Sequence, residues 1–151
     1  MSIVHVFSYG TLMIAQVMEA VTGQVFETEP ALVAGFARYG LRGESYPALV
    51  PEASCATDGV LWRDVDMEAL QHLDAFEGDW YQRISVQVML GDPPGPACTA
   101  QAETYVLVET QRHRLNHRRW SRDRFETHRL PQFLREYCGF TALPPSGDQA
   151  P

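Results

Sequence analysis

The chain has 151 residues, 45% hydrophobic and 21% charged, and a formal net charge of −7; all 12 of its lysine or arginine positions are arginine. A chain of this length buries roughly 68–70% of its unfolded surface, which suits one globular domain without disulfide or metal support. The absence of lysine excludes Schiff-base chemistry, a lysine general base and a P-loop lysine.

The N-terminal segment predicts a strand followed by a helix. Ile3–Tyr9 is an apolar run typical of a buried strand, which Gly10 ends. Thr11 is expected to N-cap a helix over Leu12–Thr22, because apolar residues recur there at helical spacing before Gly23.

The middle of the chain predicts two strands and a second helix. We expect strands over Ala31–Tyr39 and Gly59–Val65, with a loop over Gly40–Pro51 between them. A helix from Asp66 to Glu77 follows, with that aspartate as its N-cap and a glycine just beyond its end.

The C-terminal third predicts two strands, a loop and a last helix. We expect strands over Tyr81–Leu90 and Ala102–Glu109, joined by a surface loop over Gly91–Ala100 that is rich in proline and glycine. Residues 120–138 predict a helix that Pro131 kinks or splits.

No repeat or internal boundary is visible in the sequence. The order of elements therefore predicts one mixed α+β domain over residues 1–140 and a disordered tail over residues 141–151. The three cysteines (Cys55, Cys98 and Cys138) form no CxxC pair, so we expect no disulfide framework or zinc ribbon, and a reduced cytoplasmic compartment. Neither a signal peptide nor an apolar run long enough for a membrane span is present, so no membrane partner is expected.

The junction Tyr9-Gly10-Thr11-Leu12 is a candidate anion site. Gly10 permits a tight turn, and the N-terminus of the following helix presents free N–H groups and the positive end of its dipole. A plain structural turn gives the same pattern and, on this pattern alone, is the favoured interpretation.

Glu77 is a candidate general acid/base. At about 100° per residue it falls on the apolar face of its predicted helix, aligned with Leu70 and Leu73. Burial and a place in the last helical turn both raise the pKa of a carboxyl group, which suits proton transfer near neutral pH. The alternative is a structural carboxylate bound to Arg83 or to a tyrosine, whereas Asp74 lies near the edge of the face and is expected in solvent.

Other residues carry weaker signals. His113 and His117 have the spacing of zinc ligands on a helix, but no carboxylate or thiol lies near them in the sequence, so we expect no metal. No nucleophile motif occurs, and we interpret Ser8 and Cys138 as structural.

Arginine is concentrated at the C-terminal end. Residues 112–151 hold 8 arginines and 4 acidic residues, against 4 arginines and 15 acidic residues in residues 1–111. This run matches no nucleic-acid-binding motif, so we interpret it as a solvated helical face and regard a nucleic-acid partner as the disfavoured alternative.

Four motifs occur in order along the chain. They are Tyr9-Gly10-Thr11-Leu12, Tyr46-Pro47-Ala48-Leu49-Val50-Pro51, Gly59-Val60-Leu61-Trp62, and Leu73-Asp74-Ala75-Phe76-Glu77-Gly78 followed by Tyr81-Gln82-Arg83. In this order and spacing the chain resembles the gamma-glutamylcyclotransferase-like family, and more closely its short branch of gamma-glutamylamine cyclotransferases and plant avirulence-induced proteins. The likeness covers about residues 5–109, and the predicted helix over Trp120–Phe140 also fits that branch.

The resemblance implies a small mixed β-barrel flanked by helices, with a cavity at one end. It implies that the backbone of Tyr9, Gly10, Thr11 and Leu12 binds a γ-glutamyl group and that Glu77 is the acid/base, and that Tyr46 and Tyr105 line the same cavity. The implied reaction is attack of the substrate's α-amine on its own γ-amide carbonyl, which gives 5-oxoproline and a free amine without a cofactor.

Two features depart from the family pattern. Met13-Ile14 follows the loop where this branch often carries a basic residue, and the arginine-rich stretch 112–124 is not a family feature. The leaving amine and the oligomeric state therefore stay open. The alternative function is a non-catalytic ligand-binding or protein-interaction module on the same fold.

Overall fold

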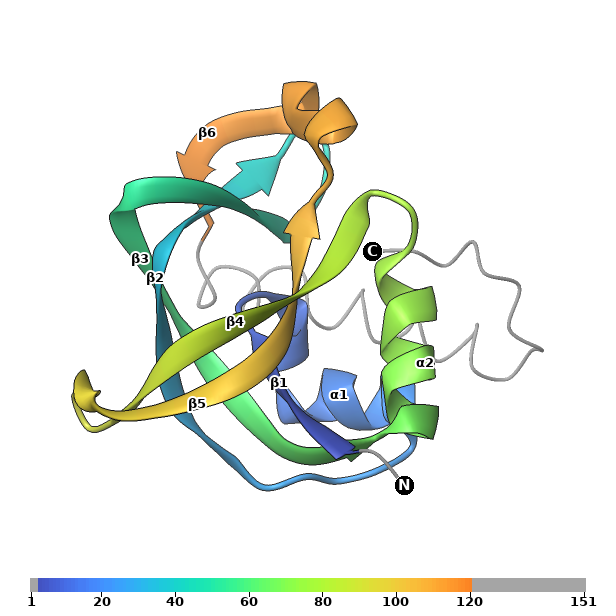
Figure 1. Cartoon of the computed structure of the whole chain (residues 1–151). Helices are drawn as coiled ribbons and strands as arrows, with labels where there is room; N and C mark the ends of the chain where they lie inside the picture. Colours follow the sequence, from blue (N-terminus) through green and yellow to red (C-terminus); the bar gives the residue numbers. More distant parts are fainter. Residues whose placement is uncertain (1–2, 121–151) are drawn as a thin grey trace.

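The computed structural model describes residues 3–120, in which a ring of β-strands carries two α-helices on one side (Figure 1). The strands are β1 (Ile3–Ser8), β2 (Thr28–Leu41), β3 (Pro47–Asp66), β4 (Tyr81–Gly91), β5 (Pro94–Leu107) and β6 (Leu115–Arg119). The helices are α1 (Ala15–Thr22) and α2 (Met67–Glu77), with short 3₁₀ turns η1 (Thr11–Met13) and η2 (Glu109–Arg114).

The sheet closes on itself. The strands run in the order β3-β1-β5-β4-β2-β6, and β2 also pairs with β3, so that the first five strands form a ring and β6 joins the far end of β2. The β1–β5 pair is parallel and the other pairs are antiparallel. The mixed α+β class predicted from the order of elements and the barrel flanked by helices that the resemblance implies are both confirmed.

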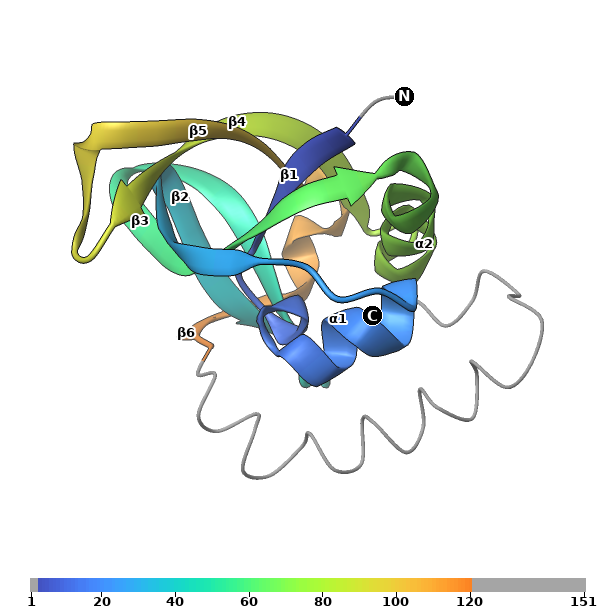
Figure 2. The same cartoon turned by 90° about the horizontal axis from the view of Figure 1, so that it is seen from below.

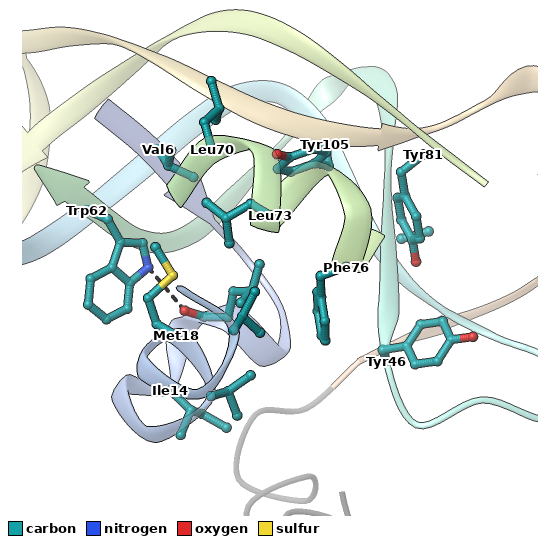
Figure 3. Packing of buried hydrophobic residues seen from close by; sticks show 14 of the residues in the cluster. Val6, Ile14, Met18, Tyr46, Trp62, Leu70, Leu73, Phe76, Tyr81 and Tyr105 are labelled. Atoms are coloured by element: carbon teal, nitrogen blue, oxygen red, sulfur yellow. Dashed lines mark hydrogen bonds between the residues drawn. The ribbon is translucent and has the colours of Figure 1, made fainter. Parts of the chain in front are cut away.

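Strand β1 separates two apolar clusters. Because side chains alternate along a strand, Val6 packs with the helix residues Leu70 and Leu73, whereas Phe7 packs inside the ring with Leu61. Figure 3 shows the helix-side cluster, and Figure 2 shows α1 and α2 together on that side of the ring. The end of β1 is therefore held between the ring and the helices.

The first α-helix begins later than predicted, and Thr11 is not its N-cap. Residues Thr11–Met13 form a separate 3₁₀ turn, and α1 starts at Ala15 after an extended Ile14 that makes no side-chain cap. The indole Nε1 of Trp62, on β3, donates to the Leu12 carbonyl at 3.0 Å (Figure 3). In a continuous helix this carbonyl would instead accept a backbone N–H of the helix itself.

Both predicted loops are shorter than expected. Within 40–51, β2 extends to Leu41 and β3 already begins at Pro47, which is the first residue of its strand and so needs no ladder N–H. Within 91–100, β5 begins at Pro94 and pairs with β4 back to Gly91. Proline and glycine composition predicted loops there, but cross-strand pairing determines the strand ends.

The second helix is confirmed. The Asp66 carboxylate caps it by accepting a hydrogen bond from the Ala69 N–H at 2.8 Å, and Gly78 follows its last residue. None of the helices within residues 3–120 is long and apolar enough to cross a membrane.

The described part of the arginine run is not a helical face. Residues 112–119 form the end of η2 and strand β6, which pairs with β2 through Leu41 and Leu115. Two of these arginines cover aromatic rings: Arg114 lies 4.0 Å from the Trp80 ring centroid, and Arg119 lies 5.6 Å from that of Tyr39. The predicted helix over 120–138, Cys138 and the predicted tail over 141–151 lie outside the described residues.

Candidate functional site

A pocket with about 350 Å³ of empty space, partly open to solvent, lies where β1 meets η1 and the C-terminal end of α2. Its lining consists of Phe7, Ser8, Tyr9, Gly10, Thr11, Leu12, Tyr46, Pro47, Glu77, Tyr81 and Tyr105. The structure thus brings together in one pocket all the residues that the sequence indicated: the loop from Tyr9 to Leu12, Glu77, Tyr46 and Tyr105.

Glu77 reaches the pocket from the last turn of α2. It is 9% exposed, on the helix face that also buries Leu70, Leu73 and Phe76. Among the described residues it forms no hydrogen bond and no ion pair. Burial, and then the negative charge of Asp74, raise its pKa from 4.5 to about 8. A carboxyl group in this environment exchanges its proton near neutral pH.

Asp74 takes the partners that the structural alternative assigned to Glu77. Its Oδ1 accepts a hydrogen bond from Arg83 Nε at 2.9 Å and from the Tyr105 hydroxyl at 2.6 Å. The Asp74 side chain is 39% exposed, as its place at the edge of the helix face predicts, but it is also paired with these two residues. The edge of α2 faces β4 and β5, whose side chains the helical pattern alone does not reveal.

Four tyrosines line the pocket, and each directs its hydroxyl to a protein group. The Tyr9 hydroxyl donates to the Tyr105 carbonyl at 2.7 Å, and the Tyr81 hydroxyl donates to the Pro47 carbonyl at 2.8 Å. Tyr105 donates to Asp74 as above, and Tyr46 hydrogen-bonds Glu44. Burial raises the pKa of all four above its ordinary value, so they stay neutral. Figure 3 shows Tyr46, Tyr81 and Tyr105 near Phe76 at the end of α2.

The loop that follows β1 is held from two directions. A Cβ atom on Gly10 would lie 2.8 Å from the ring of Pro47, so only glycine fits at this close approach. On the other side, Nη1 of Arg38 donates to the Tyr9 carbonyl at 2.8 Å and to the Asp58 carbonyl at 2.9 Å. The backbone between Tyr9 and Leu12 is thereby fixed at the pocket wall.

Sequence reasoning missed part of this site. Phe7, Ser8, Pro47 and Tyr81 also line the pocket, and Arg38 binds its loop from outside. Ser8 carried a usable signal, because alternation along an apolar strand places its hydroxyl on the same face as Val6. Arg38 carried none, since its contact with Tyr9 spans 29 positions in sequence.

The two histidines considered as metal ligands do not share a helix. His113 belongs to η2 and His117 to β6, where its ring centroid is 5.7 Å from that of Tyr39. Within residues 3–120, no group of three or more His, Cys, Asp or Glu side chains is arranged to hold a metal ion.

Residues 6–122 match the family described as gamma-glutamyl cyclotransferase, AIG2-like. The chain belongs to this family. AIG2-like protein D of Arabidopsis thaliana is 33% identical over 104 residues, which cover 69% of this chain and 67% of that protein. Protein AIG2 C of the same plant is 32% identical over 104 residues, covering 69% of this chain and 61% of that protein. The matched region is thus about two thirds or less of these relatives' length.

Solved structures show the same fold. A solution structure from Arabidopsis thaliana superposes with a TM-score of 0.69 at 26% identity, covering 93% of this chain and 82% of that one. A structure titled gamma-glutamyl cyclotransferase superposes with a TM-score of 0.59 at 16% identity, covering 71% and 68%. The resemblance inferred from the four motifs is confirmed.

Proposed function

We propose that this protein is a cyclotransferase that converts a γ-glutamyl amide or amine to 5-oxoproline and a free amine. The observation that carries the proposal is Glu77: a buried carboxyl group without a partner among the described residues, in one pocket with the Tyr9–Leu12 loop. Membership of the gamma-glutamyl cyclotransferase family supports this reaction.

Glu77 serves as base and then as acid. An α-ammonium group cannot attack a carbonyl, so the Glu77 carboxylate first removes one proton from it. The freed amine forms a C–N bond to the γ-carbonyl carbon, and an electron pair moves to the carbonyl oxygen. When that pair returns, the original amide C–N bond breaks and Glu77 gives its proton to the leaving amine. The ring nitrogen, which gained a positive charge on attack, then loses its second proton through the Glu77 carboxylate to the amine, so that neutral lactam and an ammonium ion leave the pocket. With a pKa of about 8, Glu77 is populated in both forms near neutral pH.

The pocket walls hold the substrate folded. Ring closure requires the α-amine and the γ-carbonyl to meet, and a confined site supplies this proximity. The backbone from Gly10 to Leu12 lines the pocket and presents N–H groups to the substrate's carboxylate and to the developing oxyanion. Tyr46 and Tyr105 pack against the bound glutamyl group. The reaction consumes no water and requires no metal or cofactor.

The test is a substrate panel. The protein is incubated at high concentration with γ-glutamyl dipeptides, γ-glutamyl-lysine and γ-glutamyl derivatives of small amines, and 5-oxoproline, free amine and glutamate are quantified. We expect 5-oxoproline and amine in equal amounts from at least one member, without glutamate. Absence of 5-oxoproline from every member rejects the enzyme, and binding without turnover favours the ligand-binding module instead.

A further inference from the structure

Ser8 is the last residue of β1, and its hydroxyl lies at the wall of the pocket. The residue is 4% exposed, and its Oγ is the buried side-chain oxygen or nitrogen that lacks a hydrogen-bond partner within residues 3–120. A buried hydroxyl left unpaired destabilises a fold, and in native proteins such a group calls for an explanation.

Three buried threonines outside the pocket lining have paired hydroxyls. Thr104, 0% exposed on the neighbouring strand β5, donates to the Phe7 carbonyl at 2.8 Å. Thr22 and Thr57 donate to the carbonyls of Met18 and Phe36 at 2.8 and 3.0 Å. The fold therefore supplies acceptors where hydroxyls are structural, and it supplies none to Ser8.

The direction of Ser8 follows from the alternation of β1. Phe7 and Tyr9 belong to the ring cluster, so Ser8 shares the face of Val6, which packs against α2. The carboxyl group of Glu77 enters the pocket from this same helix.

Three of the pocket tyrosines cannot donate a hydrogen bond to a ligand. The hydroxyl protons of Tyr9, Tyr81 and Tyr105 are donated to protein acceptors at 2.7, 2.8 and 2.6 Å, so these groups are available to a ligand as acceptors only. Ser8 retains an uncommitted O–H. An acyl group with a carbonyl and a carboxylate oxygen requires donors of this kind.

We propose that the Ser8 hydroxyl donates a hydrogen bond to an oxygen of the bound γ-glutamyl group, as a substrate-contacting residue beside the loop and Glu77. The assignment rests on the proposed function for the identity of the ligand. It replaces the structural interpretation of Ser8 with one in which the substrate supplies the missing partner.

The experiment compares Ser8→Ala with Thr104→Val in the full chain. Ser8→Ala removes an unpaired hydroxyl, so we expect an unchanged or higher Tm without ligand and a fall in kcat/KM of roughly 10- to 100-fold. Thr104→Val removes a paired hydroxyl away from the pocket lining, so we expect the reverse: a lower Tm and kcat/KM within about threefold of wild type. A fall in kcat assigns the contact to the acyl oxygen, and a rise in KM alone assigns it to the carboxylate.

A second readout separates this proposal from the proposed function. Thermal shift is measured with increasing 5-oxoproline, the product, on wild type and Ser8→Ala. If wild type turns over substrate and Ser8→Ala has the same kcat/KM, the proposed role of Ser8 is wrong, whereas the proposed cyclotransferase activity is supported. If wild type shows no turnover, a smaller shift in Ser8→Ala supports Ser8 as a ligand contact, and equal or absent shifts overturn it.

Discussion

Asp74 and Glu77 lie one turn apart at the end of α2 and have opposite environments. Asp74 holds Arg83 and Tyr105 through its Oδ1, whereas Glu77 is buried without a partner among the described residues. Arg83 is paired with Asp74 and Glu103, and the negative charge of Asp74 helps to raise the pKa of Glu77. The pair turns an ordinary helical carboxylate into a group that titrates near pH 8.

Glu77 makes the fold less stable as the pH rises. In the unfolded chain its pKa is near 4.5, and in the folded protein it is about 8. Below pH 4.5 both states are protonated; between the two values only the unfolded chain loses the proton, so the free energy of unfolding falls up to about pH 8. We expect Glu77→Gln to exceed wild type in stability by an amount that grows across this window, on the order of a few kcal/mol at its upper end.

Thermal melts between pH 4 and 9 measure this difference. Glu68→Gln is the matched control, because Glu68 lies exposed in the first turn of the same helix. A Glu77→Gln difference that does not change with pH contradicts a raised pKa.

The pH dependence of kcat/KM should report the same group. The Glu77 carboxylate of the free enzyme is the base, so activity should rise with unit slope on the acid side toward a pKa of about 8. The measurement is a pH–rate profile of 5-oxoproline formation at limiting substrate. An acid limb near pH 4 to 5 would assign the base to a carboxylate in an ordinary environment.

Replacing Asp74 should shift the acid limb of the pH profile of kcat/KM. Asp74→Asn removes the negative charge that raises the pKa of Glu77, so the acid limb should move to lower pH. Arg83 and Tyr105 also lose a charged acceptor. The free energy of unfolding should therefore fall by about 1–3 kcal/mol, and the Tm should fall with it. A variant with reduced Tm and an unmoved limb would show that burial alone sets the pKa.

Arg38 should act through the loop that it holds. Arg38→Gln removes the donor to the Tyr9 carbonyl, so we expect a severalfold lower kcat/KM together with a loss of about 1–3 kcal/mol of stability. Asp58→Asn is the control: its carboxylate pairs with Arg38 but is 78% exposed, and the backbone contacts of Arg38 survive. Equal effects of the two variants would argue against the loop contact.

Gly10 should tolerate no side chain. Gly10→Ala places a Cβ atom 2.8 Å from the Pro47 ring, so we expect about 1–3 kcal/mol lower stability and a displaced loop with reduced kcat/KM. Gly95→Ala, where a Cβ meets nothing within 4 Å, is the control for the substitution itself. Unfolding midpoints in urea measure both, and a Gly10→Ala midpoint equal to that of Gly95→Ala contradicts the close approach.

Local patterns predicted the parts of the site that depend on local geometry. The burial of Glu77 follows from the spacing of Leu70 and Leu73 on one helix, and the Asp66 cap follows from a side chain three residues from its partner. The family resemblance implied that the loop, Glu77, Tyr46 and Tyr105 belong to one cavity, and they line one pocket.

What the sequence did not reveal depends on strand pairing. Pro47 and Pro94 suggested loops but open strands, because they pair with Gly40 and Gly91 on the adjacent strands β2 and β4. The Tyr105 hydroxyl reaches Asp74 across 31 positions, and Trp62 reaches Leu12 across 50. Contacts between residues so far apart in the sequence determine where α1 begins and which carboxylate stays unpaired. The periodicity of hydrophobic residues does not predict such contacts.

The central claim is that Glu77 transfers the proton that makes ring closure possible. The most direct test is the rate of 5-oxoproline formation at pH 8 by wild type, Glu77→Gln and Glu68→Gln, with the best substrate of the panel. We predict that Glu77→Gln loses roughly 10²- to 10⁴-fold in kcat while it stays folded, and that Glu68→Gln matches wild type. Wild-type turnover retained in folded Glu77→Gln would contradict the account.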